Sequence, residues 1–258
     1  MERIGDYQVE REIRREDGAT TYAAVHLVLP RRATLRVLDG GKKPVALAML
    51  REACILEALH HPGIPRVFEC GVLADKRPWV AMELIEGPTF VELCREGPLA
   101  IVDLVVALRV VSEVLEHAHG RGVLHQRLGE GVIVRAPGRH TDFTVTGWGG
   151  VGTRDGNASS DPSRDVHALG TLAFRALTGT AYTPSASART GAAAAPLELA
   201  ELIDDMLAPG RTPTARDVVE RARWLGDTVV PRRATQEIQT IETESSRQTT
   251  FSIRIQRR

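Results

Sequence analysis

The sequence predicts an α+β fold with two unequal lobes: a small β-rich lobe that contains one main helix, and a larger lobe that is mainly α-helical. Short runs rich in β-branched residues fill the first third of the chain, and segments with helical periodicity fill most of the rest. A length of 258 residues is also close to the size at which a single hydrophobic core stops growing. We therefore expect lobes at residues 1–85 and 86–229, followed by a mobile or partner-docking tail at residues 230–258.

The first lobe contains five strand-like runs, each bounded by Gly, Pro or Asp. They are YQVEREI, TTYAAVHLV, RRATLRVL, RVFECGVL and PWVAMELI. One helix is predicted between the third and fourth runs, at about Val45 to His60, and the Pro62-Gly63 pair ends it. Its apolar residues form one stripe, so we expect it to pack across the strands; they are Met49, Ala53, Leu56 and Leu59.

Helical patterns dominate the second lobe. Apolar residues recur at spacings of four and three between Leu104 and Ala118, and RDVHALGTLAFRALTG predicts a second, buried helix. The low-complexity stretch TPSASARTGAAAAP is expected to be a surface connection. TPTARDVVERARWLG predicts the last helix, with its first turn capped either by Thr212 or by a box formed by Thr214 and Asp217.

The charge balance argues against binding to polyanions. Basic and acidic residues number 33 each, so no net field draws the chain to nucleic acid or to an anionic membrane. No window approaches the ~18 uninterrupted apolar residues of a membrane span, and the N-terminal MERIGDYQVEREIRRED is charged. We therefore expect a cytoplasmic protein with no nucleic-acid or membrane partner.

Cysteine and histidine spacings do not indicate a metal site. The three cysteines lie far apart, so we expect reduced, buried thiols; they are Cys54, Cys70 and Cys94. The paired histidines are adjacent or two residues apart, positions that do not share a helix face. These pairs are His60 with His61 and His117 with His119.

Five segments in a fixed order carry a resemblance to a known family. They are LREACILEALHHPGIPRV, VAMELIEGPTF, HAHGRGVLHQRL, RDVHALGTLAFRALTG and PGRTPTARDVVERA. From Tyr7 to Asp227 the chain resembles the eukaryotic-like protein kinases, especially bacterial Ser/Thr kinases. The resemblance implies structural roles for a helix carboxylate, a loop histidine, an internal aromatic ring and a helix-start aspartate. The corresponding residues are Glu52, His125, Trp148 and Asp165.

The segment HQRLGEGV stands where this family has HRDLKPEN. Arg127 matches the catalytic base, and Val132 and Gly147 match the two magnesium ligands. An arginine has no lone pair for a proton, and valine and glycine side chains offer no oxygen to a metal. Gly129 replaces the phosphate-binding lysine of the loop, and Gln126 replaces the arginine that reads activation-loop phosphorylation.

The resemblance also locates a vestigial nucleotide pocket. Arg36 replaces the lysine of the third strand, and Glu16 stands in the phosphate loop, where a carboxylate would repel phosphate. Its expected lining is Glu16, Arg36, Met82, Glu83 and Ile85. ATP and magnesium binding are therefore expected to be weak or absent, with no cofactor and no bound metal.

These losses predict a pseudokinase: not an enzyme, but a scaffold or allosteric regulator of signalling proteins. The alternative is a nucleotide-binding or atypical phosphotransfer enzyme in which Arg36 and Arg127 neutralise phosphates without magnesium. Arg127 could instead pair with Glu52 or Glu130, and Trp148 could plug the adenine or metal region rather than fill the core.

The tail offers a separate hypothesis about partners. It is rich in Thr, Ser and Arg, and phosphorylation there would create a docking site for a phosphothreonine-binding protein of the FHA type. An active Ser/Thr kinase is a second expected partner, engaged through the helix that carries Glu52 or through the alternating segment FSIRIQ. The expected phosphosites are Thr235, Thr240, Thr243 and Thr250.

Overall fold

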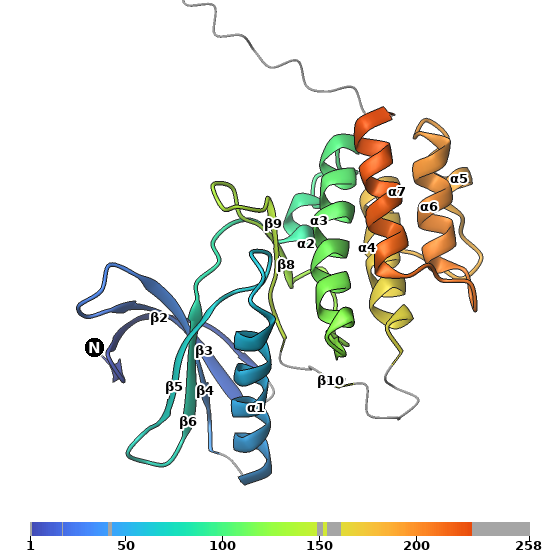
Figure 1. Cartoon of the computed structure of the whole chain (residues 1–258). Coiled ribbons are helices and arrows are strands. Elements are labelled where there is room, and N and C mark those ends of the chain that lie inside the picture. Colours follow the sequence, from blue (N-terminus) through green and yellow to red (C-terminus); the bar gives the residue numbers. More distant parts are fainter. Residues whose placement is uncertain (1, 17, 41–42, 149–151, 154–160, 229–258) are drawn as a thin grey trace, which may run out of the picture.

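An antiparallel sheet and one long helix form the N-terminal lobe of the computed structural model, which describes residues 2–16, 18–40, 43–148, 152–153 and 161–228 (Figure 1). The sheet has six strands in the order β1-β2-β3-β4-β6-β5. Strands β2 to β6 correspond to the five predicted runs. The strands are β1 (Arg3–Ile4), β2 (Tyr7–Glu16), β3 (Ala19–His26), β4 (Arg32–Leu38), β5 (Val67–Val72) and β6 (Pro78–Glu83).

Helix α1 (Lys43–Leu59) packs against this sheet, as its apolar stripe predicted. Met49 and Ala53 join a buried cluster with strand residues Leu38 and Val80. Further along the helix, Leu56 belongs to the core of the other lobe. The helix therefore contacts both lobes.

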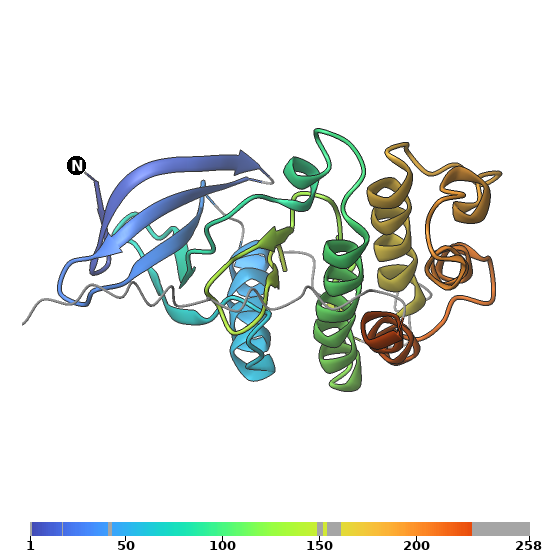
Figure 2. The same ribbon diagram turned by 90° about the horizontal axis from the view of Figure 1, so that it is seen from above.

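The C-terminal lobe is helical, so the structure has the predicted α+β architecture of two lobes. Helix α3 lies beside α4 and α7 in both views (Figure 2). Most of one face of α3 is buried, because its apolar residues repeat at helical spacing. The helices are α2 (Phe90–Leu93), α3 (Ile101–Gly120), α4 (Ser163–Thr178), α5 (Ala188–Gly191), α6 (Leu197–Leu207) and α7 (Ala215–Thr228).

Two small antiparallel pairs lie near the junction of the lobes. Strand β7 (Val123–Leu124) pairs with β10 (Gly152–Thr153), and β8 (Ile133–Arg135) pairs with β9 (Phe143–Val145). The loop between β7 and β8 contains the HQRLGEGV segment. These strands are too short to be recognised by alternation, and the sequence analysis did not predict them.

The start of α7 settles the choice between its two predicted caps. Thr214 Oγ1 donates to Asp217 Oδ2 at 2.7 Å and accepts from the Asp217 N–H at 3.2 Å. The Thr214 N–H also donates to Asp217 Oδ2 at 2.9 Å, which completes a reciprocal capping box. Thr212 Oγ1 instead donates to the carbonyl oxygen of Ala208 at 3.2 Å.

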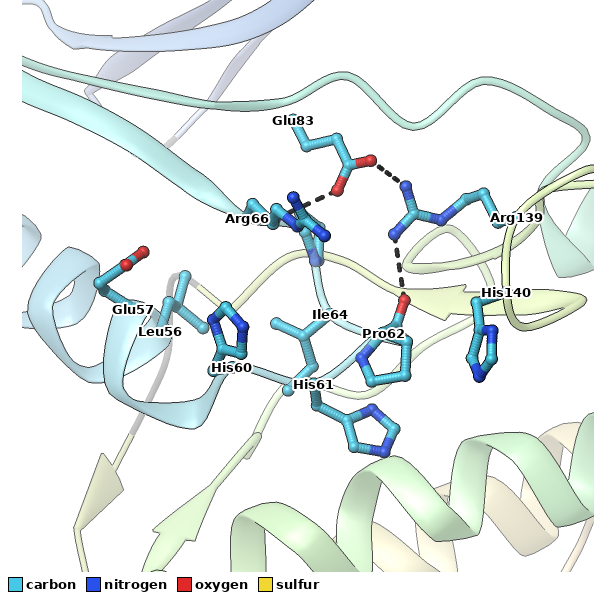
Figure 3. Close-up of a pocket in the computed structure, with 11 residues that line it drawn as sticks. Leu56, Glu57, His60, His61, Pro62, Ile64, Arg66, Glu83, Arg139 and His140 are labelled. Atoms are coloured by element: carbon cyan, nitrogen blue, oxygen red, sulfur yellow. Dashed lines mark hydrogen bonds and ion pairs between the residues drawn. The ribbon is translucent and has the colours of Figure 1, made fainter.

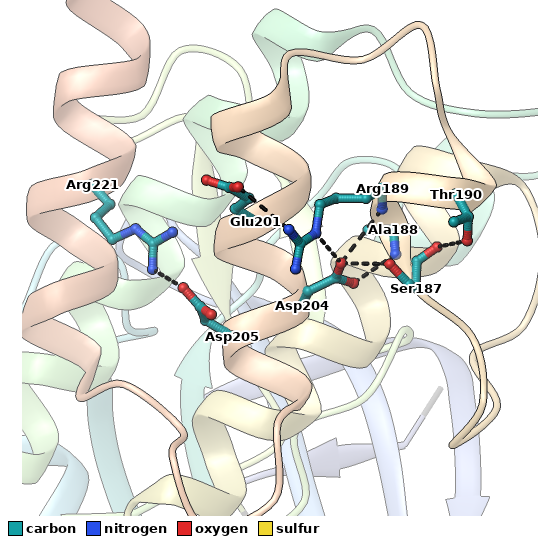
Figure 4. A network of polar contacts seen from close by, with 8 residues as sticks. All are labelled: Ser187, Ala188, Arg189, Thr190, Glu201, Asp204, Asp205 and Arg221. Carbon is teal, nitrogen blue, oxygen red and sulfur yellow. Dashed lines mark hydrogen bonds and ion pairs between the residues drawn. The ribbon is translucent and has the colours of Figure 1, made fainter.

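The low-complexity stretch is more ordered than a surface connection. It contains α5, and Ala188 in that helix is fully buried. Asp204 on α6, a helix that the sequence analysis left unassigned, accepts from Ser187 Oγ and from the Ala188 N–H, both at 2.6 Å (Figure 4). Burial alone would raise the pKa of Asp204, but these bonds and those from Arg189 lower it.

The expectation of buried thiols is wrong. Cys54 and Cys70 are exposed and Cys94 is half-buried, and all three are free cysteines. Cys54 follows the buried Ala53 on α1, and successive residues of a helix point in different directions, so Cys54 faces away from the sheet. For a strand residue such as Cys70, burial depends on the side of the sheet to which it points.

Among the described helices, none has the length and apolar composition that crossing a bilayer requires.

Candidate functional site

A cavity of about 500 Å³ lies between the lobes, within the size range of small-molecule sites. Its lining comes from β2, β3, β4 and α1, from the end of β6 and the segment that follows it, and from β8 and the loops on either side of it. Basic side chains reach it from both lobes. Its polar lining residues, together with the apolar residues at and just after the end of β6, are Arg14, Thr21, Thr34, Arg36, Glu52, Met82, Glu83, Leu84, Ile85, Arg127 and Thr146.

Arg36 and Glu52 form an ion pair at the back of this cavity. Arg36 is held on β4 by pairing with Val80 of β6, and its Nη1 lies 3.2 Å from Glu52 Oε2. The side chains of Arg36 and Glu52 are only 22% and 14% exposed. Burial raises the pKa of Glu52 to about 7, against the opposing effects of Arg36 and Arg127. The carboxylate therefore titrates near neutral pH although it has two basic neighbours.

The loop that carries Arg127 is fixed by Asp165 at the start of α4. Asp165 accepts the backbone N–H groups of His125 at 2.9 Å and of Gln126 at 2.8 Å. Gln126 has a φ of 62°, an unusual conformation for a residue other than glycine. The two hydrogen bonds to one buried carboxylate hold this backbone in place and fix the position from which Arg127 enters the cavity.

His119 is a further member of this network, which sequence reasoning missed. Its Nε2 lies 3.0 Å from Asp165 Oδ2, and its side chain is 10% exposed. Burial would raise the pKa of Asp165, but His119 and the two backbone donors lower it. The only signal in the sequence is a histidine in the last turn of the helix before the loop, which is too common to single out.

His125 and Trp148 form the buried floor beside the loop. The rings of His125 and Trp148 lie 4.7 Å apart, and Trp148 is 2% exposed. Trp148 Nε1 donates to the carbonyl oxygen of Val145 at 2.8 Å, while His125 Nε2 lies 2.9 Å from the carbonyl oxygen of Thr146. Burial lowers the pKa of His125, so the imidazole is neutral at pH 7. Trp148 is thus a packed core ring with one edge on the cavity.

Gly147 and Val132 fit against one another. Gly147 has a φ of 72°, and a Cβ added to it would lie 2.5 Å from Val132 Cγ1. No real side chain tolerates that approach, so position 147 requires glycine as long as valine occupies position 132. The two positions therefore form one small apolar contact at the edge of the cavity.

Comparison with known proteins identifies the family. The chain is 30% identical over 204 residues to the Ser/Thr protein kinase PknL of Mycobacterium tuberculosis, which covers 69% of this chain and 50% of PknL. It is 28% identical over 202 residues to PknJ of the same species, covering 68% of this chain and 34% of PknJ. The solved autoinhibited serine kinase domain of titin matches with a TM-score of 0.74 at 15% identity, over 88% of this chain and 83% of that domain. The chain belongs to the protein kinase-like superfamily. No protein-family model matches it.

These relatives correct one expectation from the sequence. The kinase-like chain was expected not to be an enzyme, but its relatives are named Ser/Thr protein kinases and its fold is that of a kinase domain, which point to an enzyme. The missing base, metal ligands and phosphate loop were the reason to expect no activity. The kinase-like chain spans about half the length of PknL and about a third of PknJ.

The positions that the kinase resemblance assigns to magnesium do not suit that ion. Val132 and Gly147 offer it no side-chain oxygen, and Arg127 brings a positive charge to the same cavity. In the part of the kinase-like chain that the structure describes, no group of three or more His, Cys, Asp or Glu residues could hold a metal. No chemical step is therefore derived through a metal ion.

Other predicted residues of the kinase-like chain fall in and around the cavity. Met82, Glu83 and Ile85 line it, whereas Gly129 is not among its lining residues. Glu130, one expected partner of Arg127, instead bonds Arg175 at 2.6 Å. The predicted phosphosites Thr235, Thr240, Thr243 and Thr250, the FSIRIQ segment and the side chain of Glu16 lie outside the described residues.

Proposed function

We propose that the cleft binds a nucleoside di- or triphosphate without magnesium, in a kinase-family enzyme with altered phosphoryl chemistry. The observation that carries this proposal is the convergence of Arg36 from the N-terminal lobe and Arg127 from the C-terminal lobe on one cavity of about 500 Å³. Met82, Leu84 and Ile85 supply the apolar edge of the same cavity, where a base would lie. The size and the mixed lining suit a nucleotide.

The charges favour an anion in this cavity. Guanidinium groups bind phosphate through paired hydrogen bonds and stay protonated, so the two arginines can take over charge neutralisation from a metal. Both arginines also lower the pKa of Glu52, which places both positive charges near one carboxylate. A phosphate beside Arg36 would add negative charge near Glu52 and favour its protonated form. Binding is therefore expected to take up protons and to strengthen between pH 8 and pH 6.

The same residues limit the mechanism of phosphoryl transfer. Arg127 can stabilise developing charge on a transferred phosphoryl group but cannot accept a proton. Glu52 is a carboxylate of the cleft whose pKa, about 7, lies near physiological pH, as a proton acceptor requires. We therefore assign charge stabilisation to the two arginines. Glu52 is the proton acceptor to be tested, and because a bound phosphate favours its protonated form, transfer is expected to need a pH above 7, where binding is weaker.

A regulatory role is a second candidate, favoured by the contact between Arg36 and Glu52. This ion pair joins α1 to the sheet, and a nucleotide phosphate on Arg36 would compete with it. Nucleotide binding would then alter how α1 is held against the sheet, and a signalling protein that recognises α1 would sense the change. An active Ser/Thr kinase or a phosphothreonine-binding protein is the expected class of partner.

Thermal unfolding with ADP or ATP, each with magnesium or with EDTA, tests nucleotide binding. A ligand at 100 times its Kd adds about 2.7 kcal/mol, which moves the midpoint of a domain of this size by roughly 5 to 10 °C. We expect the shift to persist in EDTA and to disappear in Arg36→Met and in Arg127→Met. Arg11→Met, at an exposed position on β2, is the matched control. Release of ADP from ATP, measured in parallel, reports transfer.

Two outcomes would contradict the proposal. A protein that shows no shift with either nucleotide does not bind it at this site, and a shift that requires magnesium means that a metal ion is held where no ligand was recognised. If wild type binds nucleotide but releases ADP no faster than Glu52→Gln does, the nucleotide site stands and Glu52 is not the proton acceptor.

A further inference from the structure

A second cavity, of about 280 Å³, shares part of its wall with the cleft (Figure 3). It lies where the end of α1, the α1–β5 connection, the end of β6 and the β8–β9 turn meet. Leu56, Pro65 and Glu83 line both cavities. A molecule in the second cavity would therefore touch residues that also form the wall of the cleft.

The polar wall of this cavity is held in place by Arg139. One of its terminal nitrogens, Nη1, bonds Glu83 Oε1, and the other, Nη2, donates to the carbonyl oxygen of Pro62 at 3.0 Å. The backbone N–H of Arg66 donates to the second oxygen of Glu83 at 3.3 Å. Both oxygens of the Glu83 carboxylate thus accept hydrogen bonds, and the described residues show its ion pair with Arg139 and none with Arg66.

The guanidinium of Arg66 is the charged donor that a ligand can reach. It is exposed and has no ion pair among the described residues. Nε of Arg139 lacks a hydrogen-bond partner among those residues, but it is buried and so does not face a ligand. Two exposed histidines, His60 and His140, add imidazole groups around the cavity (Figure 3).

His60 ends α1 in a left-handed conformation. Its φ of 39° is common for the residue that follows a helix, and histidine adopts it more readily than most residues. This turn places His60 among the lining residues of the cavity. Beside His60, the buried side chains of Leu56 and Ile64 give the cavity an apolar floor.

One acidic group at the rim limits the charge of the ligand. Glu57 lines the cavity and is exposed, so the site is not basic enough for a polyphosphate. A planar carboxylate matches the paired donors of a guanidinium and carries a single charge. The volume, just under the usual range for ligand pockets, allows only a short apolar body behind that carboxylate.

We propose that this cavity is a second ligand site, which binds a small carboxylate through Arg66, with the neighbouring imidazoles as further donors and with Leu56 and Ile64 against its apolar body. The site does not depend on nucleotide binding in the cleft. Since the two cavities share three wall residues, occupancy of one changes the surface that the other presents.

Fluorine NMR of 4-fluorobenzoate with the full chain tests this site. We expect saturable broadening of the probe signal that unlabelled benzoate reverses. Affinity should fall by about tenfold in Arg66→Met, because the variant loses the charged donor, and should be unchanged in Arg11→Met. The neutral 4-fluorobenzamide should not bind. Circular dichroism of Arg66→Met, changed at an exposed position, checks that the variant is folded.

Four results would contradict a carboxylate site in this cavity. Absence of saturable binding at millimolar probe, equal binding of the amide, or full affinity in a folded Arg66→Met would overturn it. Displacement of the probe by ADP through simple competition would place the probe in the cleft instead. Phenyl phosphate binding more than tenfold tighter than benzoate would show that the ligand class is wrong.

Discussion

Replacing Glu52 by glutamine should change how stability depends on pH. The carboxylate is buried, and its pKa is about 7 in the folded chain against 4.5 in its ordinary state. Between these two values the folded chain holds a proton that the unfolded chain has lost. Stability therefore falls as pH rises through this window, and the loss is complete above pH 7.

The size of the effect follows from the width of the window. A separation of about 2.5 units corresponds to about 3 kcal/mol, at 1.36 kcal/mol per unit. The free energy of unfolding of Glu52→Gln, measured relative to wild type, should rise by about 2.5 kcal/mol between pH 5 and pH 8, because the window begins at pH 4.5. A difference that does not depend on pH, such as a changed hydrogen bond to Arg36, shifts the whole curve without changing its slope. The slope is therefore the diagnostic quantity.

Urea unfolding at four or five pH values, followed by both circular dichroism and tryptophan fluorescence, measures this slope. Burial lowers the pKa of His61 to about 4, which makes wild-type stability rise between about pH 4 and 6.5. That contribution is common to wild type and variant and cancels in the difference. Glu57→Gln, at an exposed position on the same helix, is the matched control for replacing a glutamate by glutamine. A difference for Glu52→Gln that does not change with pH would refute the reasoning.

Two further substitutions test the supports of the site. Asp165→Asn removes the buried partner of His119 and should cost about 3 to 5 kcal/mol by urea unfolding, whereas Asp142→Asn at an exposed position should cost little. Because the pKa of Asp165 is lowered, its contribution is present above the ordinary carboxyl pKa of 3.8 and is lost as pH falls through the folded value; a deficit that persists in acid would contradict this. Thr214→Ala should lower stability by about 1 kcal/mol and Thr214→Ser should restore it, and equal stability of both would mean that the capping box is not stabilising.

The candidate site was only partly accessible from the sequence. The motif order placed Arg36, Arg127 and Glu52 in one region, because family motifs are local in the chain and their order fixes the fold. The close contact between Gly147 and Val132 was not predicted, since it depends on the distance between two loops. The same holds for His119, whose partner is 46 residues away.

Sequence alone determined the architecture of this protein. The β-branched runs bounded by Gly, Pro or Asp, the α1 stripe, the periodicity of α3 and the capping residues of α7 are local patterns. They gave the two lobes and the order of most elements, although not α6 or strands β7 to β10. Local spacing also offered the box at Thr214, because its two residues are neighbours in the helix turn, but it left a cap by Thr212 open as well.

Tertiary structure decided which side chains meet and which protonation states result. The pKa of Glu52 depends on burial between α1 and the sheet, and the cavity beside Arg66 exists only because Arg139 joins the β8–β9 turn to β6. Desolvation and cavity shape are properties of several segments at once. No local pattern in the sequence encodes them, because they arise only when distant segments pack together.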